Sequence, residues 1–137
     1  MDISKGFFIT GAVWLLIGMA LGMYMGANEN FTLAPVHAHI NLLGFTLMTI
    51  FGIAYRVVPG LTDNIFATAH FWLHQVGTAV TLIALFMFYN SGSKLAAGIL
   101  PPATGLIFLG IVAWLFNLLR NRDWQGSAAP SRRPQSR

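Results

Sequence analysis

Four long apolar stretches constrain this sequence more than any other feature. They cover residues 7–26, 35–58, 67–89 and 101–119. At about 1.5 Å of rise per helical residue, each is long enough to cross roughly 30 Å of hydrocarbon. With 55% apolar and only 9% charged residues, the 137-residue chain has the composition of a membrane protein. The sequence therefore predicts an all-α integral membrane protein with four transmembrane helices, all in one domain spanning residues 1–124.

The basic residues indicate how these helices cross the membrane. Lys5 precedes the first span, Arg56 closes the second, and most arginines follow the fourth, whereas Glu29 and Lys94 lie in the two opposite loops. By the positive-inside rule, both termini are cytoplasmic, and we expect the protein in a bacterial inner membrane. Residues 125–137 predict a disordered basic cytoplasmic tail. Topology explains the net positive charge, so we expect no nucleic-acid partner.

The chain has no cysteine, which leaves histidine as the residue on which any metal chemistry depends. Disulfides, iron–sulfur clusters and covalently attached haem c are excluded. Ionisable side chains at membrane depth are costly and are generally retained for a role. All four histidines fall there or at the membrane edge: His37, His39, His70 and His74.

His37 and His39 lie two residues apart near the outer end of the second span. Because a helix turns about 100° per residue, their rings are expected to point roughly 200° apart and not to chelate one ion together. Such a pair presents an imidazole to each of two neighbouring compartments. Neutral imidazole is the usual axial ligand of b-type haem, so the pair predicts a haem-binding helix that serves two haems or two halves of equivalent sites.

His70 and His74 are four residues apart and share one helix face, the spacing at which two histidines grip one zinc or copper ion. Two ligands alone make a weak site. The alternative is hydrogen bonding or stacking at the inner interface, where Trp72 also belongs. The two histidine pairs are expected on opposite sides of the membrane midplane, with His39 about 10 Å or more from it, so one iron would not reach both.

Glycine and proline mark details of the first and fourth spans. Gly18, Gly22 and Gly26 recur every four residues, a stripe that lets another helix approach closely. In the fourth span, Pro101 and Pro102 are expected to begin or kink the helix, with residues 95–100 lying at the interface before it.

Several stretches resemble the tenth helix of the catalytic subunit of haem–copper oxidases and the start of the helix after it. Residues 36–45 read VHAHINLLGF, 51–55 read FGIAY, and 70–73 read HFWL. The likeness is greatest to cbb-type oxidases and the related nitric oxide reductases. It implies that this chain corresponds to one four-helix arc of a twelve-helix subunit with pseudo-threefold symmetry. In that family, the histidine matching His37 ligates the high-spin haem and the one matching His39 the low-spin haem.

The resemblance also implies what this chain lacks. The family's copper ligands and crosslinked tyrosine lie on helices that are not present here, so we do not expect a complete oxidase. A homotrimer would rebuild the three arcs. Each compartment between subunits would then receive His37 from one chain and His39 from its neighbour.

Three functions follow from these observations. The first is a b-type haem protein that passes single electrons from an unidentified donor, or binds a small gas such as NO or O₂. The second is a haem or copper handling protein that assists assembly of a respiratory oxidase, with copper at His70 and His74. The third is a structural accessory subunit whose histidines only contact neighbouring helices.

Overall fold

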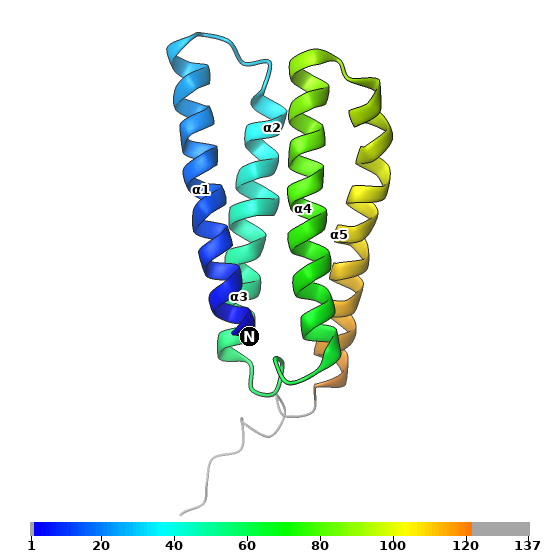
Figure 1. Ribbon diagram of the computed structural model, residues 1–137. Helices are drawn as coiled ribbons and strands as arrows, with labels where there is room; N and C mark the ends of the chain where they lie inside the picture. The colour runs from blue at the N-terminus through cyan, green and yellow to red at the C-terminus, as the bar shows by residue number, and fades with distance from the viewer. Residues whose placement is uncertain (1, 122–137) are drawn as a thin grey trace, which may run out of the picture.

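The computed structural model describes residues 2–121, and helices fill most of this range (Figure 1). They are α1 (Ile3–Ala27), α2 (Ala34–His39), the π-helix η1 (Ile40–Thr46), α3 (Leu47–Val57), α4 (Ile65–Ser91) and α5 (Lys94–Arg120). Because α2, η1 and α3 follow one another without a break, residues 2–121 form four rods standing side by side. The predicted tail, 125–137, lies outside the described residues.

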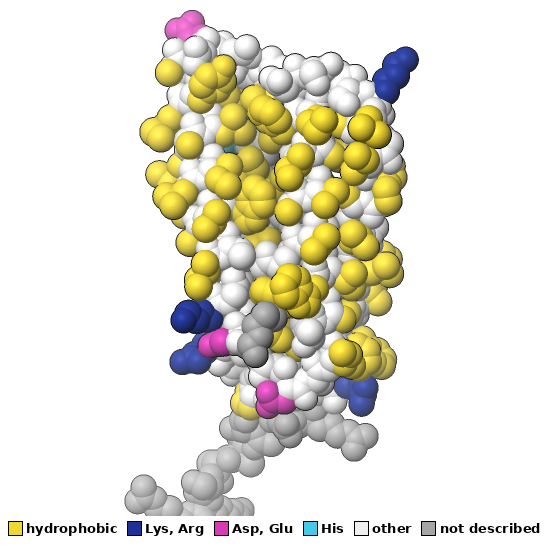
Figure 2. Space-filling view, in the orientation of Figure 1, with side chains coloured by type: hydrophobic (Ala, Val, Ile, Leu, Met, Phe, Trp, Pro, Cys, Tyr) yellow, Lys and Arg dark blue, Asp and Glu magenta, His cyan; other side chains and the backbone are white. Residues whose placement is uncertain are grey.

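All four rods are long and apolar enough to cross a membrane: Ile3–Ala27, Ala34–Val57, Ile65–Ser91 and Lys94–Arg120. Hydrophobic side chains cover the visible face over most of its height, and lysine and arginine lie near the two ends (Figure 2). The prediction of an all-helical, multi-pass membrane protein with four spans is therefore confirmed.

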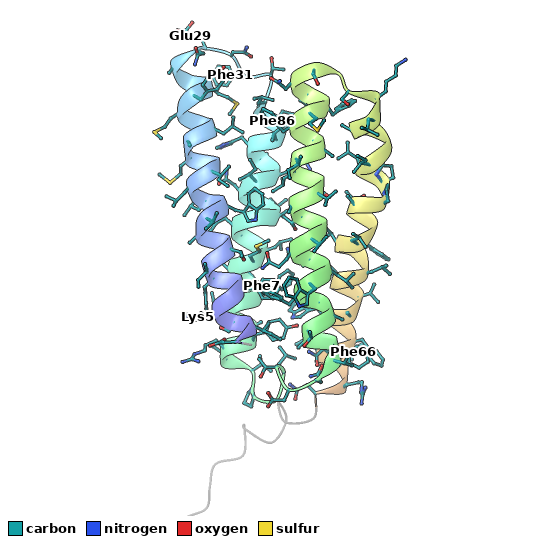
Figure 3. All side chains as sticks on the ribbon, viewed as in Figure 1. Lys5, Phe7, Glu29, Phe31, Phe66 and Phe86 are labelled. Atoms are coloured by element: carbon teal, nitrogen blue, oxygen red, sulfur yellow. The ribbon has the colours of Figure 1, made fainter. Side chains whose placement is uncertain are left out.

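The two ends of the bundle are distinguished by the chain's path. We call the end that carries Asp2 and Asn121 the terminal end, and the end with the α1–α2 and α4–α5 connections the loop end (Figure 1). Lys5 lies near the terminal end and Glu29 at the loop end (Figure 3). The rods therefore alternate in direction, and the two chain ends described here lie on the same side of the bundle.

Side-chain caps begin three of the rods. Asp2 accepts a hydrogen bond from the Lys5 amide at 2.9 Å, and Asn64 accepts one from Ala67. Ser93 caps α5 in the same way, at 3.2 Å from the Ala96 amide. Each oxygen satisfies an amide that has no partner within its helix.

The cap at Ser93 places the start of the fourth rod before the proline pair. Pro101 and Pro102 lie inside α5, whereas the sequence led us to expect the span to begin there, after a separate interfacial segment. Thr104 donates from its hydroxyl to the carbonyls of Leu100 and Pro101 at 2.9 and 3.0 Å. Such side-chain bonds are one means by which a membrane helix accommodates proline.

Two apolar clusters form the core. The cluster nearer the terminal end consists of Ile3, Phe7, Met48, Phe51, Tyr55, Val58, Leu61, Ala67 and Phe71. The cluster nearer the loop end is smaller: Met25, Leu33, Val36, Ile40 and Leu82. Phe7 points from α1 into the bundle interior (Figure 3). Between the two clusters, Gly77 brings α4 against α5, because a Cβ there would lie 2.9 Å from the amide nitrogen of Ile107.

The π-helix η1 interrupts the second span directly after His39. The Leu47 amide bonds to the carbonyl of Leu42, five residues back, and α3 then continues as an α-helix. In the regular α-helix that follows, each amide bonds to the carbonyl four residues back, so the next acceptor after Leu42 is Gly44. The carbonyl of Leu43, between them, accepts no bond from its own helix. The oxygen of Leu43 instead lies 3.3 Å from Nε2 of His74, so the irregular turn supplies a main-chain acceptor to a neighbouring rod.

Candidate functional site

The four histidines form two separate groups. His37 and His39 lie in α2 near the loop end, and His70 and His74 lie in the first turns of α4, toward the terminal end. The structure therefore pairs the histidines as the sequence does and brings the two pairs to different levels of the bundle.

His37 is half-buried and faces α1. Its Nδ1 lies 2.9 Å from the carbonyl oxygen of Gly18. Because a carbonyl only accepts, Nδ1 carries the proton in this bond and Nε2 is left as the basic nitrogen. The amide of Asn41 is 3.2 Å from that Nε2 and also donates to the His37 carbonyl at 2.9 Å.

The glycine stripe of α1 makes room for these two side chains. A Cβ at Gly22 would lie 2.9 Å from Cε1 of His37, and one at Gly18 would lie 2.8 Å from the Asn41 side-chain oxygen. A Cβ at Gly26 would meet nothing within 4 Å. The stripe therefore packs against the second span of its own chain, and two of its three glycines accommodate polar side chains there.

His39 lies on the other side of α2 and is exposed. Its Nδ1 donates to the carbonyl of Pro35 at 2.7 Å, which leaves Nε2 as the basic nitrogen here too. Leu42, one turn further along the chain, is 55% exposed. His37 thus turns toward the interior of its own chain, and His39 turns away from it.

His70 and His74 are fully buried, at 0% exposure. Their ring centroids are 5.7 Å apart with 57° between the planes. Nδ1 of His70 lies 2.9 Å from the Tyr55 hydroxyl, and Nε2 of His74 donates to the carbonyl of Leu43. Each ring is therefore held through one of its two nitrogens.

Aromatic rings from the other three rods surround this pair. Phe51 of α3 packs edge-on against both, with centroids 4.4 Å from His70 and 5.0 Å from His74. Phe7 of α1 lies 5.2 Å from His70, and Trp114 of α5 lies 6.2 Å from it. These ring contacts are tilted or edge-on, and they lie in the bundle interior, where all four rods meet.

The second nitrogen of each buried ring has no hydrogen-bond partner among the described residues. These atoms are Nε2 of His70 and Nδ1 of His74. The hydroxyls of Thr78 and Thr81, further along the same face of α4, are likewise buried without a partner. Buried polar atoms are nearly always paired, so this row calls for a physical explanation. Within residues 2–121, no group of three or more His, Asp and Glu side chains gathers in a metal-binding arrangement.

Sequence reasoning missed the residues that enclose His70 and His74. Phe51 and Tyr55 are four residues apart in α3, as His70 and His74 are in α4. Residues at this spacing share a helix face, and a short turn joins the two helices. The matching four-residue spacings in two helices joined by a short turn could have indicated the contact between Tyr55 and His70. Trp114 belongs to α5. Which side of α5 faces the histidines depends on how this helix packs, so no sequence signal indicates that Trp114 lies beside them.

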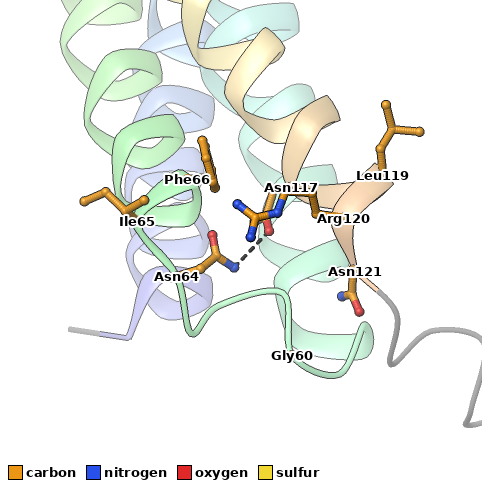
Figure 4. Close-up of a pocket in the computed structure, with 8 residues that line it drawn as sticks. All are labelled: Gly60, Asn64, Ile65, Phe66, Asn117, Leu119, Arg120 and Asn121. Carbon is orange, nitrogen blue, oxygen red and sulfur yellow. Dashed lines mark hydrogen bonds between the residues drawn. The ribbon is translucent and has the colours of Figure 1, made fainter.

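A polar depression at the terminal end is held together by its own amides (Figure 4). Asn64 donates to the side-chain oxygen of Asn117 at 2.8 Å, and Asn117 donates to the Leu61 carbonyl at 2.8 Å. Arg120 sits over the ring of Phe66, with its guanidinium carbon 5.4 Å from the centroid. These contacts fasten the α3–α4 turn to the end of α5.

Comparison with known proteins gave no match: no family model matches the chain, and neither a curated protein nor a solved structure is similar to it. The resemblance of residues 36–45 to haem–copper oxidases therefore stays a prediction.

Proposed function

We propose that this protein binds haem b through His37 and His39 and uses it to pass single electrons or to bind a small gas. One observation supports the proposal above all. Both rings donate Nδ1–H to a main-chain carbonyl, that of Gly18 or that of Pro35, and keep Nε2 as the basic nitrogen. An imidazole fixed in this way is in the form that ligates metals and haem iron.

The surroundings of His39 fit a haem. The ring is exposed, and the side chain of Leu42 beside it offers apolar surface to a porphyrin. Bound haem would supply an iron that changes oxidation state or holds a gas. The protein's own part is to hold His39 in one tautomer through Pro35 and to present Nε2 outward from the bundle.

His37 fits the same chemistry only if its Nε2 exchanges the neighbouring Asn41 amide for iron. Because His37 faces α1 while His39 faces outward, we assign the two rings to different irons. In a homotrimer, each haem would take His39 from one protomer and, once its ring turns out of the contact with α1, His37 from the next, giving one haem per protomer. Two ligands on each iron favour electron transfer, and one favours gas binding.

The membrane orientation is part of this proposal. Lys5, Arg56 and Arg120 lie at the terminal end, and Glu29 lies at the loop end. The positive-inside rule then makes the terminal end cytoplasmic, and the haem site faces the outside of a bacterial inner membrane. Without the copper ligands of the oxidases, we assign the chain no oxygen reduction of its own.

A pyridine haemochrome assay on the purified full-length protein tests the proposal. We expect about one b haem per protomer in the wild type and loss of most haem in His39→Ala and in His37→Ala. A haem-free wild type, or equal haem content in all three proteins, would refute it. Absorption spectra with and without CO then separate a six-coordinate iron from an open one.

A further inference from the structure

We propose that His70 and His74 bind one Cu(I) ion at the centre of the bundle. The observations behind this are independent of haem. Two fully buried imidazoles stand one helical turn apart, and each has one hydrogen-bonded nitrogen and one nitrogen without a partner. Leaving two such nitrogens unsatisfied is costly in an apolar core, and a shared ion removes both costs at once.

The hydrogen bonds on the far side of each ring are those expected of metal ligands. A ligating histidine commonly donates its other N–H to a carbonyl or another oxygen, which fixes the tautomer and the ring orientation. His74 does so to the Leu43 carbonyl, so its lone pair is on Nδ1. Nδ1 of His70 lies 2.9 Å from the Tyr55 hydroxyl, and the site requires the tautomer in which Nδ1 donates to that oxygen and Nε2 keeps the lone pair. In that tautomer of His70, and in His74 as bound to Leu43, the nitrogen left for a metal is the one without a partner.

The π-helix gives this arrangement a second, separate support. The carbonyl that holds His74 is the one passed over where η1 returns to regular α-helical spacing. Single π-turns inside α-helices are rare and frequently mark functional sites. Here the irregular turn orients the Leu43 oxygen toward His74.

The separation of the rings suits one ion between them. With metal–nitrogen bonds of about 2.0 Å, two imidazoles on one metal have centroids roughly 5 to 6 Å apart. The observed separation is 5.7 Å. The ring of Phe51, at 4.4 and 5.0 Å from the two histidines, shields the pair from other ligands.

The chemistry of the site favours monovalent copper. Within residues 2–121, no carboxylate joins the two histidines in a metal-binding group, so the ion's charge would not be neutralised by the ligands. The cost of burying an ion rises with the square of its charge, which penalises Zn²⁺ and Cu²⁺ far more than Cu⁺. Cu(I) accepts as few as two ligands, whereas structural Zn²⁺ sites take four. Imidazole is a good copper ligand, and the aromatic faces of Phe51 and Trp114 tolerate a nearby cation.

Copper loading of the purified full-length protein tests this inference. The protein is incubated with a Cu(I) acetonitrile salt without oxygen, passed over a Cu(I) chelator and analysed for metal. We expect one retained copper per chain in the wild type and none in His70→Gln or His74→Gln. Tyr55→Phe keeps both ligands and loses only the orienting oxygen, so its copper affinity should fall roughly 10- to 100-fold. His39→Gln, at the exposed histidine, should retain copper as the wild type does.

The outcomes separate this site from the haem site and from misfolding. The copper-loading experiment is repeated on a protein carrying both His37→Ala and His39→Ala. Copper should still bind to this protein, whether or not it retains haem. A wild type that retains no copper, or His70→Gln and His74→Gln variants that retain all of it, would overturn the inference. So would an unchanged affinity in Tyr55→Phe, which does not depend on whether the histidine variants fold. X-ray absorption should report two nitrogen ligands, and a four-coordinate spectrum would contradict the site described.

Discussion

The two histidine pairs differ in spacing, burial and the partners that hold them. His37 and His39, two residues apart, point away from each other: His37 is bonded to the Gly18 carbonyl of α1, and exposed His39 to the Pro35 carbonyl of its own helix. His70 and His74, four apart, lie on one face, fully buried, among rings from every rod. His39 therefore presents its basic nitrogen away from the bundle, and His37 keeps its own beside the Asn41 amide. The unpartnered nitrogens of His70 and His74 lie in the bundle interior.

This difference separates an exposed histidine from a pair enclosed by the fold of one chain. The surroundings of His70 and His74 come entirely from this chain, including Tyr55 and Phe51. His39 has no such enclosure, and a haem there would find its remaining contacts on another molecule. Helical spacing thus determines whether two rings converge, whereas burial determines whether one protomer can complete the site.

The largest expected effect comes from opening the enclosed pair. Phe51→Ala removes a ring that is 2% exposed and touches both His70 and His74. Emptying this space should lower the free energy of unfolding by about 3–5 kcal/mol. Denaturant titration in detergent, followed by circular dichroism, measures it. The control Leu42→Ala changes a 55% exposed side chain and should stay within about 0.5 kcal/mol of the wild type. Equal losses in both variants would remove the distinction between an enclosed and an open pair.

The glycines of α1 provide the next test, on the side of His37. A Cβ at Gly22 would lie 2.9 Å from the imidazole, which the Gly18 carbonyl holds in place. Gly22→Ala should therefore cost roughly 1–3 kcal/mol through overpacking and weaken haem binding at His37. Gly26→Ala lies on the same stripe, where a Cβ meets nothing within 4 Å, and it should be neutral or slightly stabilising. The same unfolding titration applies, and a Gly22→Ala protein as stable as Gly26→Ala would contradict the close contact.

A smaller effect is expected from the bond that orients His70. Tyr55→Phe deletes a buried hydroxyl 2.9 Å from Nδ1 and keeps the ring. The loss should be about 1 kcal/mol, because one buried hydrogen bond is removed and a ring nitrogen is left unpaired. Tyr24→Phe is the matched control, since Tyr24 is 58% exposed and should not change stability measurably. If the two substitutions had the same effect, the hydroxyl of Tyr55 would not be supporting His70.

The sequence predicted the rods well because hydrophobic length alone determines them. Four apolar stretches became four rods, with His37 and His39 on different sides of their helix and the rings of His70 and His74 5.7 Å apart on one face. Helix geometry is local, so these features need no knowledge of neighbours. The start of α5 differed because the Ser93 cap and the αL residue Gly92 define it, whereas the proline pair was taken as the boundary.

The enclosure of His70 and His74 was beyond a local argument. The π-turn of η1 is accompanied by a contact between the Leu43 carbonyl and His74, thirty-one residues apart in the chain. Trp114 reaches the site only through the rotation of α5, which is determined by how Gly77 and Gly110 pack. The hydrophobic pattern of one span does not predict contacts between side chains of different spans. The two histidines could therefore be picked out from the sequence, whereas their surroundings depend on tertiary packing.

The smallest expected change in stability concerns His39 and distinguishes a ligand from a structural residue. His39→Gln alters an exposed side chain whose one bond is to the Pro35 carbonyl of its own helix, so haem-free protein should unfold within about 0.5 kcal/mol of the wild type. Haem content should nevertheless fall to a small fraction of the wild-type value, because the exposed Nε2 is lost. Unfolding titration and the pyridine haemochrome assay on the same preparations give both numbers. His70→Gln should show the opposite pattern, with reduced stability and normal haem content, because its ring is buried among Phe51, Tyr55 and Trp114. If His39→Gln also destabilised the haem-free protein as much as His70→Gln, both histidines would be acting as parts of the fold.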